Sequence, residues 1–266
     1  MRKKPSLLWS FHREDFPGIS YLFGTMHVHD RKAFGLIGQV ESVLRNCDAL
    51  ATEYDLDDSD TFDSSWFKDL SRDKSVREVL PEKTWTKLRR ILYKTQGIHL
   101  DAFQNAHPFV LIGTVSSLIL SKDMPLSLDE HLWETAKAWE KQTIGIETLQ
   151  EQLAIVGKIP IEAHVKNLAQ IAVNFPRYRH QTLKMAEWYA SGNLAQLHRA
   201  SVKGQGSLKR LLLYDRNAIM ADRIAAIAAS QTTLFAVGAG HLTGKYGLVR
   251  LLKNQGFKLN PIRSVS

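Results

Sequence analysis

Segments with strand character lie at the two ends of the 266-residue chain, and the residues between them are mostly helical in pattern. Short apolar runs typical of strands cover residues 7–11, 21–28 and 49–54, and two more cover residues 232–237 and 257–261. One sheet built from both ends, with the helical segments inserted between them, is the simplest arrangement. We therefore predict an α/β fold with a single mixed sheet built from N- and C-terminal strands, interrupted by a large helical insertion.

The insertion is expected at roughly residues 75–205, within a single domain that covers residues 1–266. Hydrophobic residues make up 44% and charged residues 23% of the chain, which is typical of a globular protein. The acidic residues 55–63 are predicted to form a loop. A helix at residues 36–46 separates two strand segments, so residues 21–28 and 49–54 are predicted to be parallel neighbours joined by a crossover.

Two apolar strand segments end in the same Gly-x-x-His pattern. Gly24 and His27 form the first copy, and Gly238 and His241 form the second, 214 positions later. Glycine at a strand end allows a sharp turn or a close approach to a ligand. One such histidine is usually a structural residue, but two at equivalent strand ends predict a shared site at the carboxyl edge of the sheet.

Two glutamates also end short apolar segments. Glu53 follows the run at residues 49–52, and Glu147 ends the β-branched segment 143–147. Two imidazoles and a carboxylate suit Zn, Mn, Fe or Co, so His27, His241, Glu53 and Glu147 together form a predicted metal site. Glu147 is compatible equally with function and with a place at a helix N-terminus, where an anion is favoured. For Glu53 we favour function, because a carboxylate in such apolar surroundings needs a partner.

Three further residues are candidates for the site, together with the glycine-rich turn after the second motif. Arg216 falls in the predicted helix 208–229 and could stabilise an oxyanion or hold a substrate carboxylate. Tyr246 could donate a hydrogen bond to substrate, or could simply pack its helix at residues 245–255. His29 follows His27 at strand spacing, and we interpret it as a loop residue. The glycine-rich turn at 238–244 is not a dinucleotide loop, because no acidic residue follows it in the next strand.

Charge and hydropathy limit the classes of partner. The net charge is +8, but basic residues are interspersed along the chain and no nucleic-acid-binding motif occurs, so we predict no specific nucleic-acid partner. The most apolar segment, residues 109–120, is shorter than the ~20 residues of a membrane span. The apolar run near the N-terminus is also too short for a signal peptide. These features predict a cytoplasmic protein without a membrane span, and they leave its oligomeric state open.

These motifs give the chain a resemblance to the TraB/PrgY/GumN family, which includes the Tiki metalloproteases. The matching stretches keep the family order and are residues 21–28, Glu53, and residues 127–132, 144–148, 216–217 and 237–244. The resemblance implies a metal-dependent hydrolase related in fold to erythromycin-esterase-like and ChaN-like proteins. Carried over, the two family histidines are His27 and His241, and the family glutamate is Glu53. Tiki members use a divalent metal such as Mn or Co.

The sequence thus favours a divalent-metal-dependent hydrolase of the peptidase class that uses Mn, Co or Zn. His27, His241 and one glutamate would bind the metal, the other glutamate would be the general base, and Arg216 and Tyr246 would contact a peptide or small-molecule substrate. Which of Glu53 and Glu147 is ligand and which is base is open. The alternative is a non-catalytic module that binds a peptide or small signal in the same polar pocket.

Overall fold

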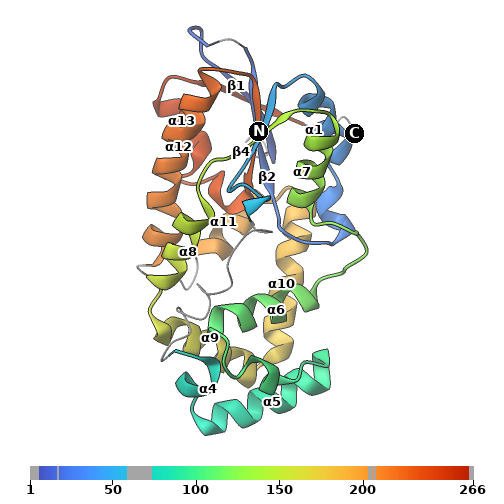
Figure 1. Cartoon of the computed structure of the whole chain (residues 1–266), viewed down its shortest axis with the longest axis vertical. Helices are drawn as coiled ribbons and strands as arrows, with labels where there is room; N and C mark the ends of the chain where they lie inside the picture. The colour runs from blue at the N-terminus through green and yellow to red at the C-terminus, as the bar shows by residue number, and fades with distance from the viewer. Residues whose placement is uncertain (1–5, 17, 59–73, 203–205, 207, 264–266) are drawn as a thin grey trace. The chain divides into compact units, whose positions relative to one another are not determined.

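The computed structural model describes residues 6–16, 18–58, 74–202, 206 and 208–263. The chain divides into two compact units (Figure 1). Unit 1 comprises Met1–Asp60, Lys122–Gln152 and Met185–Ser266, and unit 2 comprises Thr61–Ser121 and Leu153–Lys184. Unit 2 thus differs from the insertion predicted at 75–205: it begins earlier, ends at Lys184, and does not include residues 122–152. The prediction of one domain over the whole chain stays a prediction.

Unit 1 is built on the predicted mixed sheet, which confirms the α/β class. Among the described residues, six strands pair in the order β4-β3-β5-β2-β1-β6. Their bounds are β1 (Leu8–His12), β2 (Ser20–Thr25), β3 (Ala49–Thr52), β4 (Gln142–Gly145), β5 (Thr233–Gly238) and β6 (Lys258–Ile262). The strands β4, β3, β5 and β2 run parallel, whereas β1 is antiparallel to both β2 and β6.

The predicted neighbours β2 and β3 are not adjacent, which corrects the crossover prediction. Strand β5 lies between them and pairs with both in parallel. The physical reason is burial on both faces of the sheet: Thr233 to Val237 are all buried in β5. A strand covered on both sides needs a nearly continuous apolar run. The apolar segment from the C-terminal end of the chain meets that need in the middle of the sheet.

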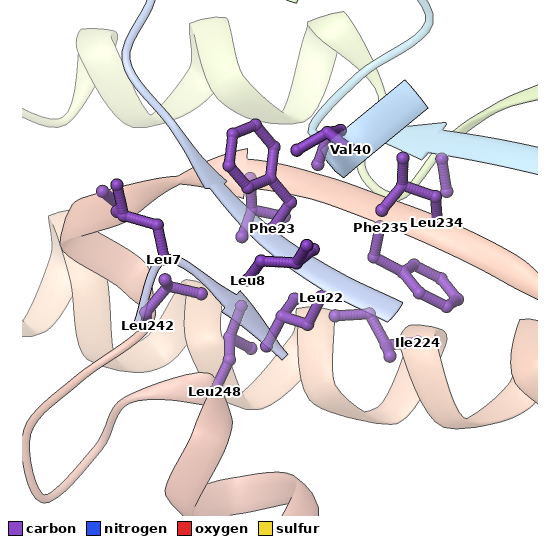
Figure 2. Close-up of a cluster of buried hydrophobic side chains, with 14 of the residues drawn as sticks. Leu7, Leu8, Leu22, Phe23, Val40, Ile224, Leu234, Phe235, Leu242 and Leu248 are labelled. Atoms are coloured by element: carbon purple, nitrogen blue, oxygen red, sulfur yellow. The ribbon is translucent and has the colours of Figure 1, made fainter. Parts of the chain in front are cut away.

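Helices pack on both faces of the sheet, because successive side chains along a strand point to opposite faces. Figure 2 shows Leu22 of β2 pointing towards Ile224 of α12 (Asp215–Ala228), while Phe23 points to the other side, towards Val40 of α1 (Ile37–Arg45). All four side chains are at most 1% exposed. The other helical elements with residues in unit 1 are η1 (Arg31–Phe34), α7 (Leu128–Ala138), α8 (Leu149–Gly157), α10 (Phe175–Ala190), α11 (Leu194–Val202), η3 (Arg210–Tyr214), η4 (Ala239–His241) and α13 (Leu248–Asn254).

Two predicted helices differ in their bounds. The helix expected at 208–229 is interrupted near its start by the π-helical turn η3, and its long α-helical part begins at Asp215. The helix expected at 245–255 begins at Leu248, directly after Gly247. A Cβ atom at Gly247 would lie 2.5 Å from the carbonyl group of Thr243, so the close turn before α13 requires glycine. The predicted acidic loop 55–63 lies outside the described residues from position 59 onwards.

Unit 2 is a helical assembly with its own apolar core. It contains α4 (Val76–Val79), α5 (Glu82–Gln96), η2 (Leu100–Phe103), α6 (Pro108–Ile119) and α9 (Ile161–Val173), with parts of α8 and α10. The core is made by apolar side chains at helical spacing, including Trp85, Leu88, Leu92, Leu111, Val115, Leu168 and Ile171.

No helix among the described residues combines the length and the apolar character that a membrane span requires. A cytoplasmic location stays a prediction.

The positive charge is not distributed evenly between the two units. Unit 2 contains fourteen Lys and Arg residues against seven Asp and Glu, whereas unit 1 contains twenty-one against twenty. Nearly all of the net charge of +8 therefore belongs to unit 2. Unit 1, which contains both Gly-x-x-His motifs, is close to neutral.

Candidate metal-binding site

Three neighbouring parallel strands deliver the predicted ligands to one edge of the sheet in unit 1. In the register of the sheet, Thr25 of β2 pairs with Gly238 of β5, and Thr52 of β3 pairs with Ala236. The chain continues by two residues to His27, by one residue to Glu53, and through the 3-10 turn η4 to His241. The three side chains meet because parallel strands end together at the same edge.

The carboxylate of Glu53 lies between the two histidine rings. Its Oε1 atom is 3.9 Å from Nε2 of His27 and 3.7 Å from Nε2 of His241. The backbone N–H of Gly238 donates a hydrogen bond of 2.7 Å to the same oxygen. A Cβ atom at position 238 would lie 3.0 Å from it, so the glycine of the second motif permits this close approach.

Asn217 of α12 determines which nitrogen of His241 carries the proton. The amide Nδ2 of Asn217 donates to the carbonyl oxygens of Tyr246 at 2.7 Å and His241 at 3.4 Å. Its Oδ1 is therefore the atom that accepts from Nδ1 of His241, at 2.5 Å. In the neutral ring, Nε2 then presents a lone pair towards Glu53. Burial lowers the pKa of His241 to about 4, against the opposing effect of the Glu53 charge, so the neutral form is the relevant one near pH 7.

Asp129 forms an ion pair with His27. Its Oδ2 atom is 2.8 Å from Nδ1 of His27, which leaves Nε2 directed to Glu53. Asp129 lies in the first turn of α7, which begins with a capping box between Ser127 and Glu130. The Asp129 charge raises the pKa of His27 well above its ordinary value of 6.5. The His27 ring is half-exposed, whereas Asp129 is buried.

Arg216 of α12 joins the two predicted glutamates. Its Nη2 atom donates to Oε2 of Glu53 at 2.8 Å and to Oε2 of Glu147 at 2.5 Å, and its Nε contacts both Glu147 oxygens at 3.1 Å. Gln152 of α8 donates to the same two Oε2 atoms, at 3.1 and 3.2 Å. Burial raises the pKa of Glu53, but the facing histidines and Arg216 outweigh burial and hold that pKa well below the ordinary value of 4.5.

The remaining candidates lie at the margin. The side chain of Tyr246 is 42% exposed and its ring stacks on Tyr214, 4.5 Å between centroids, so its contact with the site is through its backbone carbonyl. His29, interpreted from sequence as a loop residue, accepts or donates one hydrogen bond of 3.2 Å with the carbonyl of Met124. Sequence analysis did not single out Asp129 as a site residue. The signal that could have found it was the Ser127–Glu130 capping pattern, which marks a helix start and places Asp129 in its first turn.

The donor set suits a divalent ion, although its members stand slightly apart. Two imidazole nitrogens and one carboxylate oxygen are ordinary ligands for Mn, Co or Zn. Ligands held at about 2.1 Å from one ion are about 3.0–3.5 Å from each other, and the separations here are 3.7 and 3.9 Å. Among the described residues, no group of three His, Cys, Asp or Glu side chains already has the arrangement of a metal centre. The chemistry fits the ion at His241, where the lone pair of Nε2 faces Oε1 of Glu53 with no donor hydrogen between them.

A cavity of about 550 Å³ opens beside these groups, entirely within unit 1. His27 and Glu53 lie in its wall, whereas His241 is buried behind them, at 6% exposure. The other residues that line the cavity are His29, Tyr54, Leu56, Asp57, Leu126, Ser127, Asp129, Glu130, Trp133, Glu134 and Gln152. A small molecule or a short stretch of peptide could reach the ligand cluster from this side.

Comparison with known proteins gave a family and several distant relatives. The model of the TraB/PrgY/gumN family matches residues 7–261. Metalloprotease TIKI1 of Danio rerio is 23% identical over 96% of this chain, and metalloprotease TIKI2 of Xenopus tropicalis is also 23% identical over 96%. The chain spans only 62% and 59% of the length of these two relatives. The uncharacterized protein YbaP of Shigella flexneri is 25% identical over 88% of each chain. No solved structure matches significantly.

Proposed function

The chain belongs to the TraB/PrgY/gumN family, and from this premise we propose that it is a divalent-metal-dependent hydrolase that cleaves peptide bonds. The relatives named metalloproteases support the reaction class. The observation that carries the proposal is the opposed pair of His241 Nε2 and Glu53 Oε1. Two acceptors that face each other at 3.7 Å are stabilised by a cation between them.

His27, His241 and Glu53 are the proposed metal ligands. Asp129 and Asn217 are the residues that orient the two rings, as outer partners of metal-binding histidines commonly do. When bound, the metal would supply a Lewis acid and activate water at neutral pH. These roles follow from the contacts of Glu53, because its Oε1 faces both rings while its Oε2 is held by Arg216 and Gln152.

Glu147 and Arg216 form the second part of the proposed site. Both oxygens of Glu147 contact Arg216, so Glu147 is better suited to fixing the guanidinium than to removing a proton from water. We assign the ligand role to Glu53 and a positioning role to Glu147. Among the described residues, Arg216 Nη1 has no hydrogen-bond partner, and we assign to it the oxyanion or substrate carboxylate. Tyr246 keeps only a proposed role at the edge of the substrate.

The second candidate function is a non-catalytic module that binds a peptide or small signal. The observation in its favour is that Arg216 and Gln152 already satisfy Glu53 Oε2 without a metal. In that case the polar cluster would fix the wall of the cavity and need no cation. The two functions differ in whether the protein takes up stoichiometric metal.

Measuring bound metal distinguishes the hydrolase from the binding module. Wild type, His241→Ala and the exposed-surface control His180→Ala would be purified without an affinity-tag metal, dialysed against Mn, Co or Zn, and measured by elemental analysis. We expect about one equivalent of metal in wild type and in the control, and a loss of at least tenfold in affinity for His241→Ala. Metal-loaded wild type should then cleave members of a peptide library, detected by mass spectrometry. Absence of metal uptake by wild type would contradict the hydrolase and favour the binding module.

A further inference from the structure

The cavity at the proposed metal site has an acidic wall. Among the described residues that line it, five are carboxylates, two are imidazoles and none is Lys or Arg. The carboxylates are Glu53, Asp57, Asp129, Glu130 and Glu134. Asp57, Glu130 and Glu134 are 53%, 48% and 56% exposed, so they lie where an entering ligand would first meet the protein.

This acidity is local to the cavity. The whole chain has a net charge of +8, and unit 1, to which the cavity belongs, is close to neutral. Lys137 pairs with Asp57 at 2.9 Å and lies 3.6 Å from Glu134, and so neutralises part of the wall without lining it. Lys137 and a divalent ion together would offset three of the five negative charges. Arg216 contacts Glu53 but is offset by Glu147, which is not in the wall, so the cavity stays negative with the metal in place.

Asp129 provides independent evidence for a ligand with a hydrogen-bond donor. Its side chain is 4% exposed, lines the cavity, and contacts His27 through Oδ2 only. Neither of its oxygens has a hydrogen-bond partner among the described residues, and Oδ1 also lacks the ion-pair contact that Oδ2 makes with His27. Buried carboxylate oxygens are nearly always satisfied, so this atom calls for a donor supplied from the cavity.

Apolar side chains share the wall with these carboxylates. Leu56 and Leu126 line the cavity together with the aromatic residues Tyr54 and Trp133. The long side chains of Lys and Arg suit such a mixed wall, because their methylene stems pack on apolar surface while the cationic head reaches polar groups. A neutral apolar side chain would leave the carboxylates without partners, and an acidic one would be repelled.

We propose that this site prefers peptides with Lys or Arg close to the cleaved bond, a preference that rests on the proposed peptidase function. The cationic head would pair with Glu130 and Glu134 at the rim, and the donors of the bound segment would reach Asp129. Substrates with Glu or Asp in the same place would be disfavoured by like charge.

The test uses three decapeptides of identical sequence except for Lys, Gln or Glu on either side of one central bond. Metal-loaded wild type should cleave the Lys peptide with a kcat/KM about tenfold higher than the Glu peptide. Glu134→Lys should reduce or reverse this ratio, because Glu134 is exposed and its replacement leaves the helix cap of α7 intact. Glu162→Lys makes the same charge change at an exposed position of α9 outside the cavity, and should behave as wild type.

Binding is measured separately so that the two proposals can fail separately. Fluorescence anisotropy of the labelled Lys and Glu peptides with the same proteins gives affinities that do not depend on turnover. Cleavage without a preference for Lys would overturn the charge preference and leave the peptidase standing. Binding of the Lys peptide about tenfold tighter than the Glu peptide, lost in Glu134→Lys but without cleavage, would support the acidic site and contradict the peptidase. Equal binding in all variants would overturn the preference in either case.

Discussion

Acidification should weaken unit 2 through a buried histidine pair. His107 and His164 are 3% and 5% exposed, and their rings meet edge to face at 5.1 Å between centroids. Nδ1 of His107 accepts the N–H of Phe109 at the start of α6, which requires a ring nitrogen without a proton. Burial, reinforced by the charges of His164 and Lys74, lowers the pKa of His107 from 6.5 to about 4. Burial also lowers the pKa of His164.

The lowered pKa of His107 determines whether the free energy of unfolding rises or falls with pH. In the unfolded chain His107 takes up a proton below pH 6.5, whereas in the folded protein it does so only near pH 4. The unfolded state therefore binds more protons between these values, and stability falls as the pH drops. At about 1.4 kcal/mol per pKa unit, the full shift corresponds to about 3 kcal/mol, of which about 2 kcal/mol is lost between pH 7.5 and pH 5.0. His164 adds a contribution of the same sign.

The matched variant is His107→Asn, because Asn keeps a helix-capping acceptor and does not titrate. Urea unfolding at pH 7.5 and 5.0 should show that wild type loses about 2 kcal/mol more than this variant. Hydrogen exchange of peptides from α6 (Pro108–Ile119) places the loss in unit 2. His180→Asn, at an exposed position, should follow wild type. Equal losses in wild type and His107→Asn would refute the reasoning.

Four further substitutions test the site and the fold. Asn217→Leu removes the acceptor that orients His241, and we expect metal affinity to fall by about 10–100-fold in calorimetric titration, with the thermal midpoint measured alongside. Gly238→Ala brings a methyl group to 3.0 Å from Glu53 Oε1. Elemental analysis should then show less bound metal than in wild type, while the free energy of unfolding changes little. Ser127→Ala removes the cap of α7 and should cost about 1 kcal/mol in urea unfolding; no change would contradict the capping role. Leu88→Ala in the core of unit 2 should cost about 2–5 kcal/mol in the same assay, and a smaller loss would mean that the core relaxes to fill the space.

Sequence patterns were sufficient where a candidate residue simply follows a single strand. The two Gly-x-x-His motifs and Glu53 follow apolar strands, and strand ends at one edge of a sheet meet, so their proximity followed from composition and spacing. The family membership is confirmed by the match over residues 7–261. The roles of His27, His241 and Glu53 as metal ligands stay predictions. So do those of Arg216, Glu147 and Tyr246, although Arg216 does lie against both glutamates.

What the sequence did not predict depends on pairing between distant segments. The insertion of β5 between β2 and β3 is a choice of partner, and a local pattern contains no information about partners. The orphaned oxygen of Asp129 is visible only when α7 is placed against the strand ends. The π-helical turn η3 was expected to be α-helical, because apolar periodicity over five residues cannot distinguish the two.

The position of β5 sets the order in which the site can form during synthesis. The ribosome delivers β2 and β3 early, yet the strand that joins them ends at Gly238, near the end of the chain. Until then both strands present open edges, and Glu53 lacks the backbone N–H of Gly238 and the ring of His241. Open edges on a nascent chain invite wrong pairing and recruit chaperones. A chain released before β5 would therefore carry His27 and Glu53 without the Gly238 N–H and the His241 ring that complete the proposed site.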